Sequence, residues 1–299
     1  DHPMASPFLP DCLKHRVALV TGGATGIGLG ICTQLVRHGA KVAIMGRRLE
    51  VGQDAVAKLQ AEGGEAMFVQ GDVRYPEQCV AVVNAVIKRW GGLNMLVNNA
   101  AGNFVVAAED LTPKGLATVL GIDLQGCFHM CKAALEPLKQ ARDSIIINTT
   151  ATLQYKATPF QFHASAAKAG IDVLTNTIGV EWGRYGIRTV GIAPGPIVGT
   201  VGGPGGRVFG DGILETSNDA EEIRNVVPVG RYGTVTDIAL TAVFLATPAG
   251  GFINGTTVVV DGGQWHGSSM MYEAARDVIR EKSETERTQF KGGVRKAKL

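Results

Sequence analysis

The glycine-rich stretch "TGGATGIG", Thr21 to Gly28, has the residue types and the spacing of a phosphate-binding turn. Its glycines lack side chains that would hold a pyrophosphate away from the backbone. An apolar run precedes the stretch and a helical pattern follows it, so the N–H groups at a helix N-terminus would face the phosphates. The pattern therefore predicts dinucleotide binding by the turn, through Gly22, Gly23, Ala24, Thr25, Gly26, Ile27 and Gly28.

Two arginines, Arg47 and Arg48, follow the second apolar run. Sites that prefer NAD usually carry a carboxylate here for the ribose 2′-hydroxyl, and this sequence has none. Guanidinium groups can instead pair with a 2′-phosphate. The predicted cofactor is therefore NADP(H). The alternative is that both arginines are solvated residues at the start of a helix.

Seven apolar runs alternate with amphipathic stretches that are long enough to form crossover helices. This alternation is typical of an α/β fold in which helices cover both faces of a parallel sheet. We therefore expect a seven-stranded parallel sheet in one Rossmann-type domain. The predicted strands begin at Arg16, Lys41, Ala66, Leu93, Ser144, Ile187 and Thr256.

The chain is expected to divide into an N-terminal arm (1–15), the Rossmann-type domain (16–265) and a polar C-terminal extension (266–299). Residues 1–3 are expected to be left over from expression, with Met4 as the native start. The glycine- and proline-rich stretch at about 195–217 cannot hold a regular element and is predicted to be a mobile loop over a site. A plain surface loop is the alternative.

Composition excludes several classes of protein. The 299 residues carry a net charge of +2, and the basic excess lies in the C-terminal tail, so a nucleic-acid-binding body is not expected. No apolar run is long enough for a membrane span. Five scattered cysteines without a CxxC pair indicate reduced thiols, and no metal site is expected.

Four motifs occur in a fixed order: "TGGATGIG", "GDV" with Asp72, "NNAAG" from Asn98, and "PGPIVGT" from Pro194. Together they resemble the short-chain dehydrogenase/reductase family over about residues 16–263. The resemblance implies a Rossmann fold and a homotetramer or homodimer. It also implies cofactor contacts, with Asp72 accepting a hydrogen bond from the adenine amino group. The further predicted cofactor-binding residues are Val73, Asn99, Ala100, Lys168, Pro194, Gly195, Ile197 and Thr200.

The catalytic positions depart from this resemblance. Most family members use Asn, Ser, Tyr and Lys, and the Tyr hydroxyl gives its proton to the carbonyl oxygen. In "HASAAKAG" the lysine is present as Lys168, but Ala164 stands at the tyrosine position. Ala151 replaces the serine and Asp123 replaces the asparagine. Because alanine cannot donate a proton, a simple ketoreductase is disfavoured.

The stretches "NAAGNF", "GID", "NTTATL" and "HASAAKAG" resemble one branch of the family, the peroxisomal-type 2,4-dienoyl-CoA reductases. Such enzymes reduce 2,4-dienoyl-CoA to 3-enoyl-CoA with NADPH in the β-oxidation of unsaturated fatty acids. Hydride attacks the δ carbon and a proton returns to the α carbon, so an acid at position 164 would be misplaced. We expect Lys168 to hold the nicotinamide ribose. Asp123 is expected to be the general acid, directly or through a water.

The same resemblance suggests groups for the substrate. Arg74 is predicted to pair with CoA phosphates, and Phe104 to face the diene. Thr112 and Lys114 would add to the CoA rim, and Arg207 in the glycine-rich loop is a further prediction. Donors near the thioester oxygen would stabilise the dienolate. Candidates for that role are Asn148, Thr150 and Thr152.

Tyr155 raises a separate possibility, because mitochondrial relatives use a tyrosine from this loop. Here Leu153 occupies the matching place when no gap is allowed. Either Tyr155 has a catalytic role or it packs in the substrate cleft.

The sequence ends in Ala297-Lys298-Leu299, a variant of the SKL tripeptide that an import receptor reads. We therefore predict a peroxisomal location and that receptor as a partner.

Three functions stay open at this point. The first is an NADPH-dependent 2,4-dienoyl-CoA reductase, and the second is another enoyl-CoA reductase or ketoreductase of the family. The third is a catalytically inactive NADP-binding protein, since decay would also produce substitutions at the catalytic positions. The presence of Asp123, Phe104 and Arg74, where the dienoyl branch would have them, favours the first.

Overall fold

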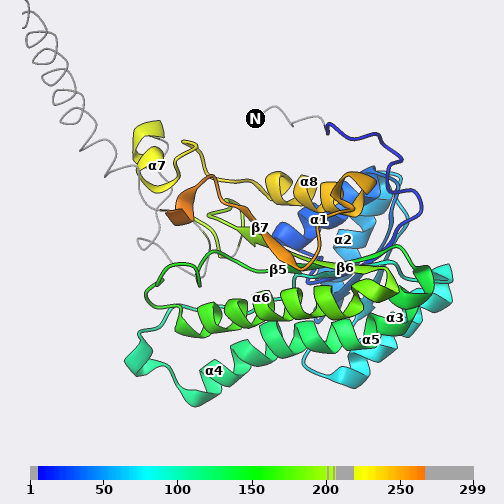
Figure 1. Cartoon of the computed structure of the whole chain (residues 1–299), viewed down its shortest axis with the longest axis horizontal. Coiled ribbons are helices and arrows are strands. Elements are labelled where there is room, and N and C mark those ends of the chain that lie inside the picture. The colour runs from blue at the N-terminus through cyan, green and yellow to red at the C-terminus, as the bar shows by residue number, and fades with distance from the viewer. Residues whose placement is uncertain (1–5, 201, 205, 207–218, 267–299) are drawn as a thin grey trace, which may run out of the picture. The chain divides into compact units, whose positions relative to one another are not determined.

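The computed structural model describes residues 6–200, 202–204, 206 and 219–266 (Figure 1). Arg207, most of the glycine-rich loop and the C-terminal extension with Ala297-Lys298-Leu299 lie outside the described residues. The chain divides into two compact units, residues 1–216 with 233–261 and residues 217–232 with 262–299. The sequence instead indicates one domain over 16–265, and those boundaries stay a prediction.

The larger unit contains a seven-stranded sheet in the order β3-β2-β1-β4-β5-β6-β7. Every neighbouring pair is parallel, which confirms the predicted α/β sheet. All residues of β4 and β5 are buried, as expected for central strands covered on both faces. The strands are β1 (Val17–Thr21), β2 (Lys41–Gly46), β3 (Ala66–Gln70), β4 (Met95–Asn98), β5 (Ser144–Thr149), β6 (Ile187–Pro194) and β7 (Thr256–Val260).

Helices cover both faces of this sheet, as predicted (Figure 1). One apolar cluster holds α1 (Gly26–Arg37), α2 (Leu49–Ala61) and α8 (Val235–Ala246) against the sheet. The cluster on the other face holds α3 (Pro76–Trp90), α5 (Gly126–Ala141) and α6 (Phe162–Trp182).

Shorter helices complete the described residues. In the larger unit, α4 (Pro113–Leu120) continues through a π-helical turn, η2 (Gly121–Gln125), into α5. The other short helices of that unit are η1 (Ala108–Asp110), η3 (Gly183–Tyr185) and η4 (Pro248–Gly250). The described part of the smaller unit contains α7 (Ala220–Val226) and η5 (Gln264–His266).

The strand order reverses between β1 and β4. The chain passes from β1 outward to β2 and β3, and then returns to place β4 on the other side of β1. In such sheets, ligands bind where the loops after the two central strands diverge. This point lies at the carboxyl ends of β1 and β4, where the glycine-rich turn and "NNAAG" begin. The fold therefore fixes the position of the site before any side chain is considered.

None of the helices in the described ranges combines the length and the apolar character that crossing a membrane requires.

Candidate active site

The glycine-rich turn joins β1 to α1. Gly22 and Gly26 have φ values of 63° and 54°, in the left-handed region that favours glycine. A Cβ at Gly28 would lie 2.4 Å from the Gly22 carbonyl oxygen, so any larger residue would push the turn apart. The turn therefore keeps bare backbone at the N-terminus of α1, as a pyrophosphate site requires.

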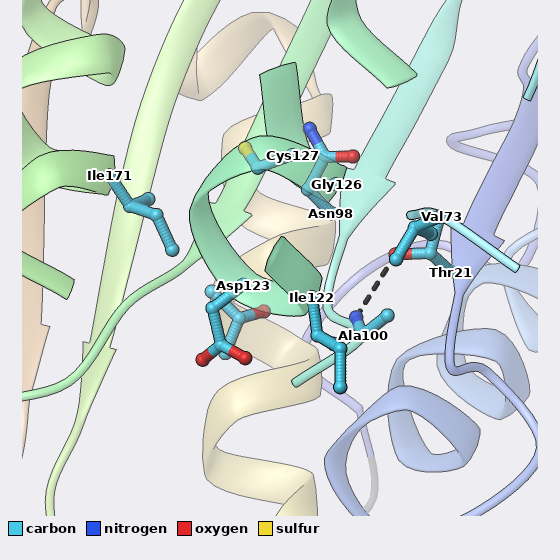
Figure 2. Close-up of a pocket in the computed structure, with 10 residues that line it drawn as sticks. Thr21, Val73, Asn98, Ala100, Ile122, Asp123, Gly126, Cys127 and Ile171 are labelled. Carbon is cyan, nitrogen blue, oxygen red and sulfur yellow. Dashed lines mark hydrogen bonds between the residues drawn. The ribbon is translucent and has the colours of Figure 1, made fainter. Parts of the chain in front are cut away.

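Side chains lock this turn to the loop after β4. Thr21 Oγ1 accepts hydrogen bonds from the backbone N–H groups of Asn99 and Ala100, each at 3.0 Å. Asn99 Nδ2 donates to the carbonyl oxygens of Thr21 and Gly22. Figure 2 shows the bond between Ala100 and Thr21. Asn99 and Ala100 therefore lie beside the turn, where the predicted cofactor would pass.

The loop after β6 also reaches the turn. Thr200 carbon atoms lie 3.9 Å from where a Cβ of Gly26 would stand. Ile197 is buried and pairs with Gly233 in an isolated bridge. A Cβ at Gly195 would meet Asp261 at 2.6 Å, so the chain passes close to the end of β7 as it leaves Pro194. The structure thus brings Thr200 to the predicted phosphate site.

Arg47 and Arg48 are exposed at the carboxyl end of β2, and Arg48 is the N-cap of α2. Among the residues that the structure describes, neither guanidinium group forms an ion pair with a carboxylate. Both are therefore available to an anionic ligand. A nicotinamide cofactor fits the bare turn and the loop locked beside it.

Asp72 and Arg74, predicted to bind adenine and CoA respectively, bind each other. Arg74 Nη2 lies 2.5 Å from Asp72 Oδ2, and its Nε also donates to that carboxylate. The Arg74 hydrogen bond lowers the pKa of Asp72, which keeps the pair charged. Arg74 remains partly exposed, so a CoA phosphate would share this guanidinium with Asp72 rather than find it free.

The structure brings Asp123 and Lys168 together. Asp123 lies in η2, whose π-helical turn joins α4 to α5, and Lys168 lies on α6. Asp123 Oδ2 is 3.3 Å from Lys168 Nζ, and Asp123 Oδ1 accepts from the Gly102 N–H at 2.7 Å. Lys168 Nζ also donates to the Thr149 carbonyl oxygen at 3.0 Å. The side chains are 1% and 10% exposed, so this is a buried ion pair.

A small cavity connects Asp123 with the cofactor end of the fold (Figure 2). Ile122 and Asp123 come from the turn before α5, and Cys127 follows on α5 itself. Thr21 is the last residue of β1, and Ala100 lies in the loop after β4 that is hydrogen-bonded to it. The remaining lining residues are Val73, Asn98, Gly126, Thr149 and Ile171. A nicotinamide ring held by the glycine-rich turn and the loop after β4 would therefore lie near the Asp123 carboxylate.

Asn148 does not fit the predicted role beside the thioester. It is 0% exposed, its Nδ2 donates to Thr175 Oγ1 and its Oδ1 accepts from Asn98 Nδ2, both at 2.9 Å. Thr150 Oγ1 accepts from Gln154 Nε2 and donates to the Lys168 carbonyl oxygen. Both side chains have hydrogen-bond partners inside the protein, so neither is free to bind the thioester oxygen.

The remaining predicted substrate residues in the described part of the chain lie in the segments that follow β4 and β5, including the start of α4. Phe104 is 37% exposed and stacks on His163 at 4.2 Å between ring centroids. Thr112 is the N-cap of α4 and accepts from the Gly115 N–H, while Lys114 is exposed. Thr152 is buried. Sequence reasoning missed His163, whose only signal was its place beside Ala164.

Tyr155 belongs to a polar network around Asp172. Asp172 accepts hydrogen bonds from Gln154 Nε2 at 2.6 Å and from Thr257 Oγ1 at 2.8 Å. Burial and the same carboxylate raise the pKa of Tyr155 to about 12. A phenol with so high a pKa is a poor acid near neutral pH. The network instead ties the loop after β5 to α6 and β7.

We therefore expect Tyr155→Phe to keep most of the activity. Loss of one hydrogen bond should lower the free energy of unfolding by about 1 kcal/mol. The kcat should stay within roughly threefold of the wild-type value, since no proton comes from this hydroxyl. Steady-state kinetics and urea unfolding measure the two effects. A fall in kcat of a hundredfold or more would return Tyr155 to the chemistry.

Comparison with known proteins shows which family the chain resembles. A family profile described as "Enoyl-(Acyl carrier protein) reductase" matches residues 22–264. The chain is 46% identical, over 88% of each sequence, to the peroxisomal 2,4-dienoyl-CoA reductase [(3E)-enoyl-CoA-producing] of Arabidopsis thaliana. It is 36% identical to a Bacillus subtilis protein named "Probable 2,4-dienoyl-CoA reductase [(2E)-enoyl-CoA-producing]", over 85% of this chain and 98% of that protein.

A solved structure gives the same answer for the fold. The crystal structure of a short-chain dehydrogenase from Bacillus anthracis superposes with a TM-score of 0.74 at 36% identity. The match covers 84% of this chain and 97% of that one. With its parallel sheet, its glycine-rich turn and the lysine on α6, the chain belongs to the short-chain dehydrogenase/reductase family, whose members use a nicotinamide cofactor.

Proposed function

We propose that this oxidoreductase is an NADPH-dependent 2,4-dienoyl-CoA reductase that forms 3-enoyl-CoA. The buried Asp123–Lys168 pair carries the proposal. It stands where a ketoreductase of the family would have Asn and Lys, while Ala151 and Ala164 remove the hydroxyl groups that such an enzyme needs. The site thus has a carboxylate that can relay a proton and a cation, but it has no hydroxyl acid for a carbonyl oxygen.

The reaction places distinct demands on these residues. The bound cofactor supplies hydride, which adds to the δ carbon of the dienoyl thioester. The displaced electron pairs shift through the diene to the thioester oxygen, and the α carbon then takes a proton. Asp123 delivers that proton, directly or through a water in the adjoining cavity. Lys168 binds the nicotinamide ribose and fixes the Asp123 carboxylate.

NADP(H) is the proposed cofactor because Arg47 and Arg48 are exposed and are not paired with carboxylates in the described part of the chain. The 2′-phosphate would receive charge-assisted hydrogen bonds from one or both. The carboxylate that would favour NAD is missing from the end of β2.

Removal of both charges should change cofactor preference. In the Arg47→Ala/Arg48→Ala variant we expect NADPH affinity to fall roughly 10- to 100-fold, the effect of losing one charge-assisted hydrogen bond. Affinity for NADH, which lacks the 2′-phosphate, should change by less than about threefold. Titration of nucleotide fluorescence measures both constants. An equal loss for the two nucleotides would contradict 2′-phosphate recognition.

The proposed acyl-CoA site follows the exposed rim near Phe104. Arg74, Thr112 and Lys114 are proposed to contact the CoA portion, with Arg207 joining them from outside the described residues. The Arabidopsis relative is named peroxisomal, and the terminal Ala297-Lys298-Leu299 supports the same address and an import receptor as partner. We also propose a homotetramer or homodimer, as the family resemblance implies.

The test is turnover of 2,4-hexadienoyl-CoA with NADPH, followed by loss of dienoyl absorbance and by chromatography of the product. We expect 3-enoyl-CoA, because the proton is delivered to the α carbon. A 2-enoyl product would mean protonation at the γ carbon, as the name of the Bacillus subtilis relative implies for that protein. Tight NADPH binding without turnover would overturn the proposal and favour a catalytically inactive NADP-binding protein.

A further inference from the structure

His163 lies in the first turn of α6, five residues before Lys168 and next to Ala164. Its side chain is 0% exposed. Within the residues that the structure describes, no hydrogen bond of standard geometry reaches either ring nitrogen, although the Phe104 backbone lies close enough to act on the ring. Fewer than one in ten buried polar groups is left unpaired in folded proteins, so this imidazole calls for an explanation.

Burial lowers the pKa of His163, so the ring is neutral at physiological pH. The Phe104 backbone and, after it, the Asp123 carboxylate act on the pKa in the opposite direction but more weakly. A neutral imidazole carries one N–H donor and one acceptor nitrogen. Leaving such groups unpaired destabilises a folded protein, whereas an apolar ring of similar size carries no such penalty. The polar ring is therefore a poor choice for packing alone.

The surroundings of His163 place it at the proposed substrate site. Phe104 stacks on the imidazole with an interplanar angle of 21°. Two further contacts fasten this loop to the start of α6: Asn103 Nδ2 donates to Gln161 Oε1 at 2.7 Å, and the Val106 N–H donates to the Phe160 carbonyl oxygen. The outer ring of the stack is partly exposed and the inner ring is buried. The Phe104 ring therefore offers a partly exposed aromatic face suited to a planar conjugated chain, with the imidazole buried behind it.

The proposed reaction needs a donor that the earlier candidates cannot supply. Negative charge develops on the thioester oxygen when hydride adds to the δ carbon, and a preorganised N–H or O–H must face it. Asn148 and Thr150 are already occupied inside the protein. The Thr149 hydroxyl is also unpaired, but it lines the cavity with the cofactor-side residues Thr21 and Ala100, whereas His163 contacts Phe104.

We propose that His163 is a catalytic residue whose neutral imidazole N–H binds the thioester carbonyl oxygen of the substrate. This inference rests on the proposed function. Hydride from the reduced nicotinamide forms the new δ C–H bond, and the electron pairs move through the diene onto the thioester oxygen, where the N–H stabilises them. They return as a proton drawn from solvent and relayed by Asp123 forms the α C–H bond, which leaves 3-enoyl-CoA and oxidised cofactor.

Substitution separates this role from packing. His163→Phe keeps an aromatic ring against Phe104 but removes the donor, so kcat should fall about 10²- to 10³-fold, as for other lost oxyanion donors. NADPH affinity should not change, and the melting temperature should stay equal or rise because an unpaired polar group is gone. His163→Gln, which restores an N–H, should recover at least tenfold of the lost kcat. Ser165→Ala removes another unpaired group of α6 and should keep the wild-type kcat.

Two results would overturn the role of His163. One is a kcat for His163→Phe within threefold of wild type. The other is an equal loss of kcat in His163→Phe and His163→Gln together with a lower melting temperature in both, which would show that the imidazole only packs.

A measurement on the wild-type chain needs no stable variant. With ¹⁵N-histidine labelling, the His163 imidazole signal should shift when 2-hexenoyl-CoA binds and stay unchanged with the thioether analogue that lacks the carbonyl. The same shift with both ligands would overturn the inference. If the wild-type enzyme does not reduce dienoyl-CoA at all, the proposed function itself is wrong. That result differs from the results that would overturn only the role of His163.

Discussion

Replacing Asp123 by Asn should lower kcat for 2,4-hexadienoyl-CoA by about 10²- to 10⁴-fold, the range for loss of a general acid. The asparagine keeps a side-chain oxygen for the Gly102 N–H, so the loop after β4 should stay in place. It has no carboxylate through which a proton can be relayed to the α carbon. NADPH affinity should stay within roughly threefold, since Asp123 contributes to proton delivery rather than to cofactor binding. Steady-state kinetics and nucleotide titration measure the two quantities.

The matched control is Asp54→Asn, which removes a carboxylate from the exposed face of α2, away from the cavity. Its kcat should equal that of the wild type. Both variants should be assayed well below their melting temperatures, because Asp123→Asn also breaks a buried ion pair. Full activity in Asp123→Asn would exclude the carboxylate as proton donor and leave bulk water as the source.

The sheet and the cofactor turn could be predicted because their signals are local. A buried parallel strand reads as a short apolar run, and each of the seven runs became a strand. The turn at Gly22 and Gly28 depends on close backbone approach, which glycine reveals in the sequence itself. Lys168 could be placed on a helix because helical spacing also depends only on residues that are close in the sequence. Features that depend on residues close together in the sequence, such as strands, helices and tight turns, could therefore be predicted.

Contacts between segments far apart in the chain could not be read in this way. Asn98 and Asn148 stand opposite each other in the register of β4 and β5, so their amides pair and neither can serve a substrate. Even the local pairing of Arg74 with Asp72 is one that spacing permits but does not require. His163 gains its meaning only from Phe104, 59 residues away in the sequence.

The π-helical turn that holds Asp123 is another feature that could not be predicted from the sequence. Such turns are rare and concentrate at functional sites. Here it lies between Gly121 and Gln125, just before Gly126, where a Cβ would meet Val73 at 2.6 Å. The close approach brings the helix against the loop after β3 while the wide turn directs Asp123 toward Gly102 and Lys168. The geometry of the acid therefore depends on a backbone feature that the sequence "GIDLQG" does not reveal.

The second large effect concerns stability rather than rate. Lys168→Met should lower the free energy of unfolding by about 3–5 kcal/mol, because it leaves the buried Asp123 carboxylate without its cation. Asp123→Asn should also destabilise the protein by leaving the Lys168 ammonium with only the Thr149 carbonyl oxygen and uncharged neighbours. Urea unfolding at neutral pH measures each change, with equal m-values confirming that the same transition is followed.

The double variant Asp123→Asn/Lys168→Met should lose much less stability than the sum of the two single losses, because no unpaired charge remains buried. Simple addition of the two losses would mean that water or relaxation already screens the pair, and the charge coupling inferred from the 3.3 Å separation would be wrong. Activity should show the opposite pattern, with the double variant at least as inactive as the worse single one. A double variant that is stable but inactive would show that an uncharged pair supports the fold equally well. The charged pair would then be needed for proton delivery and cofactor binding rather than for stability.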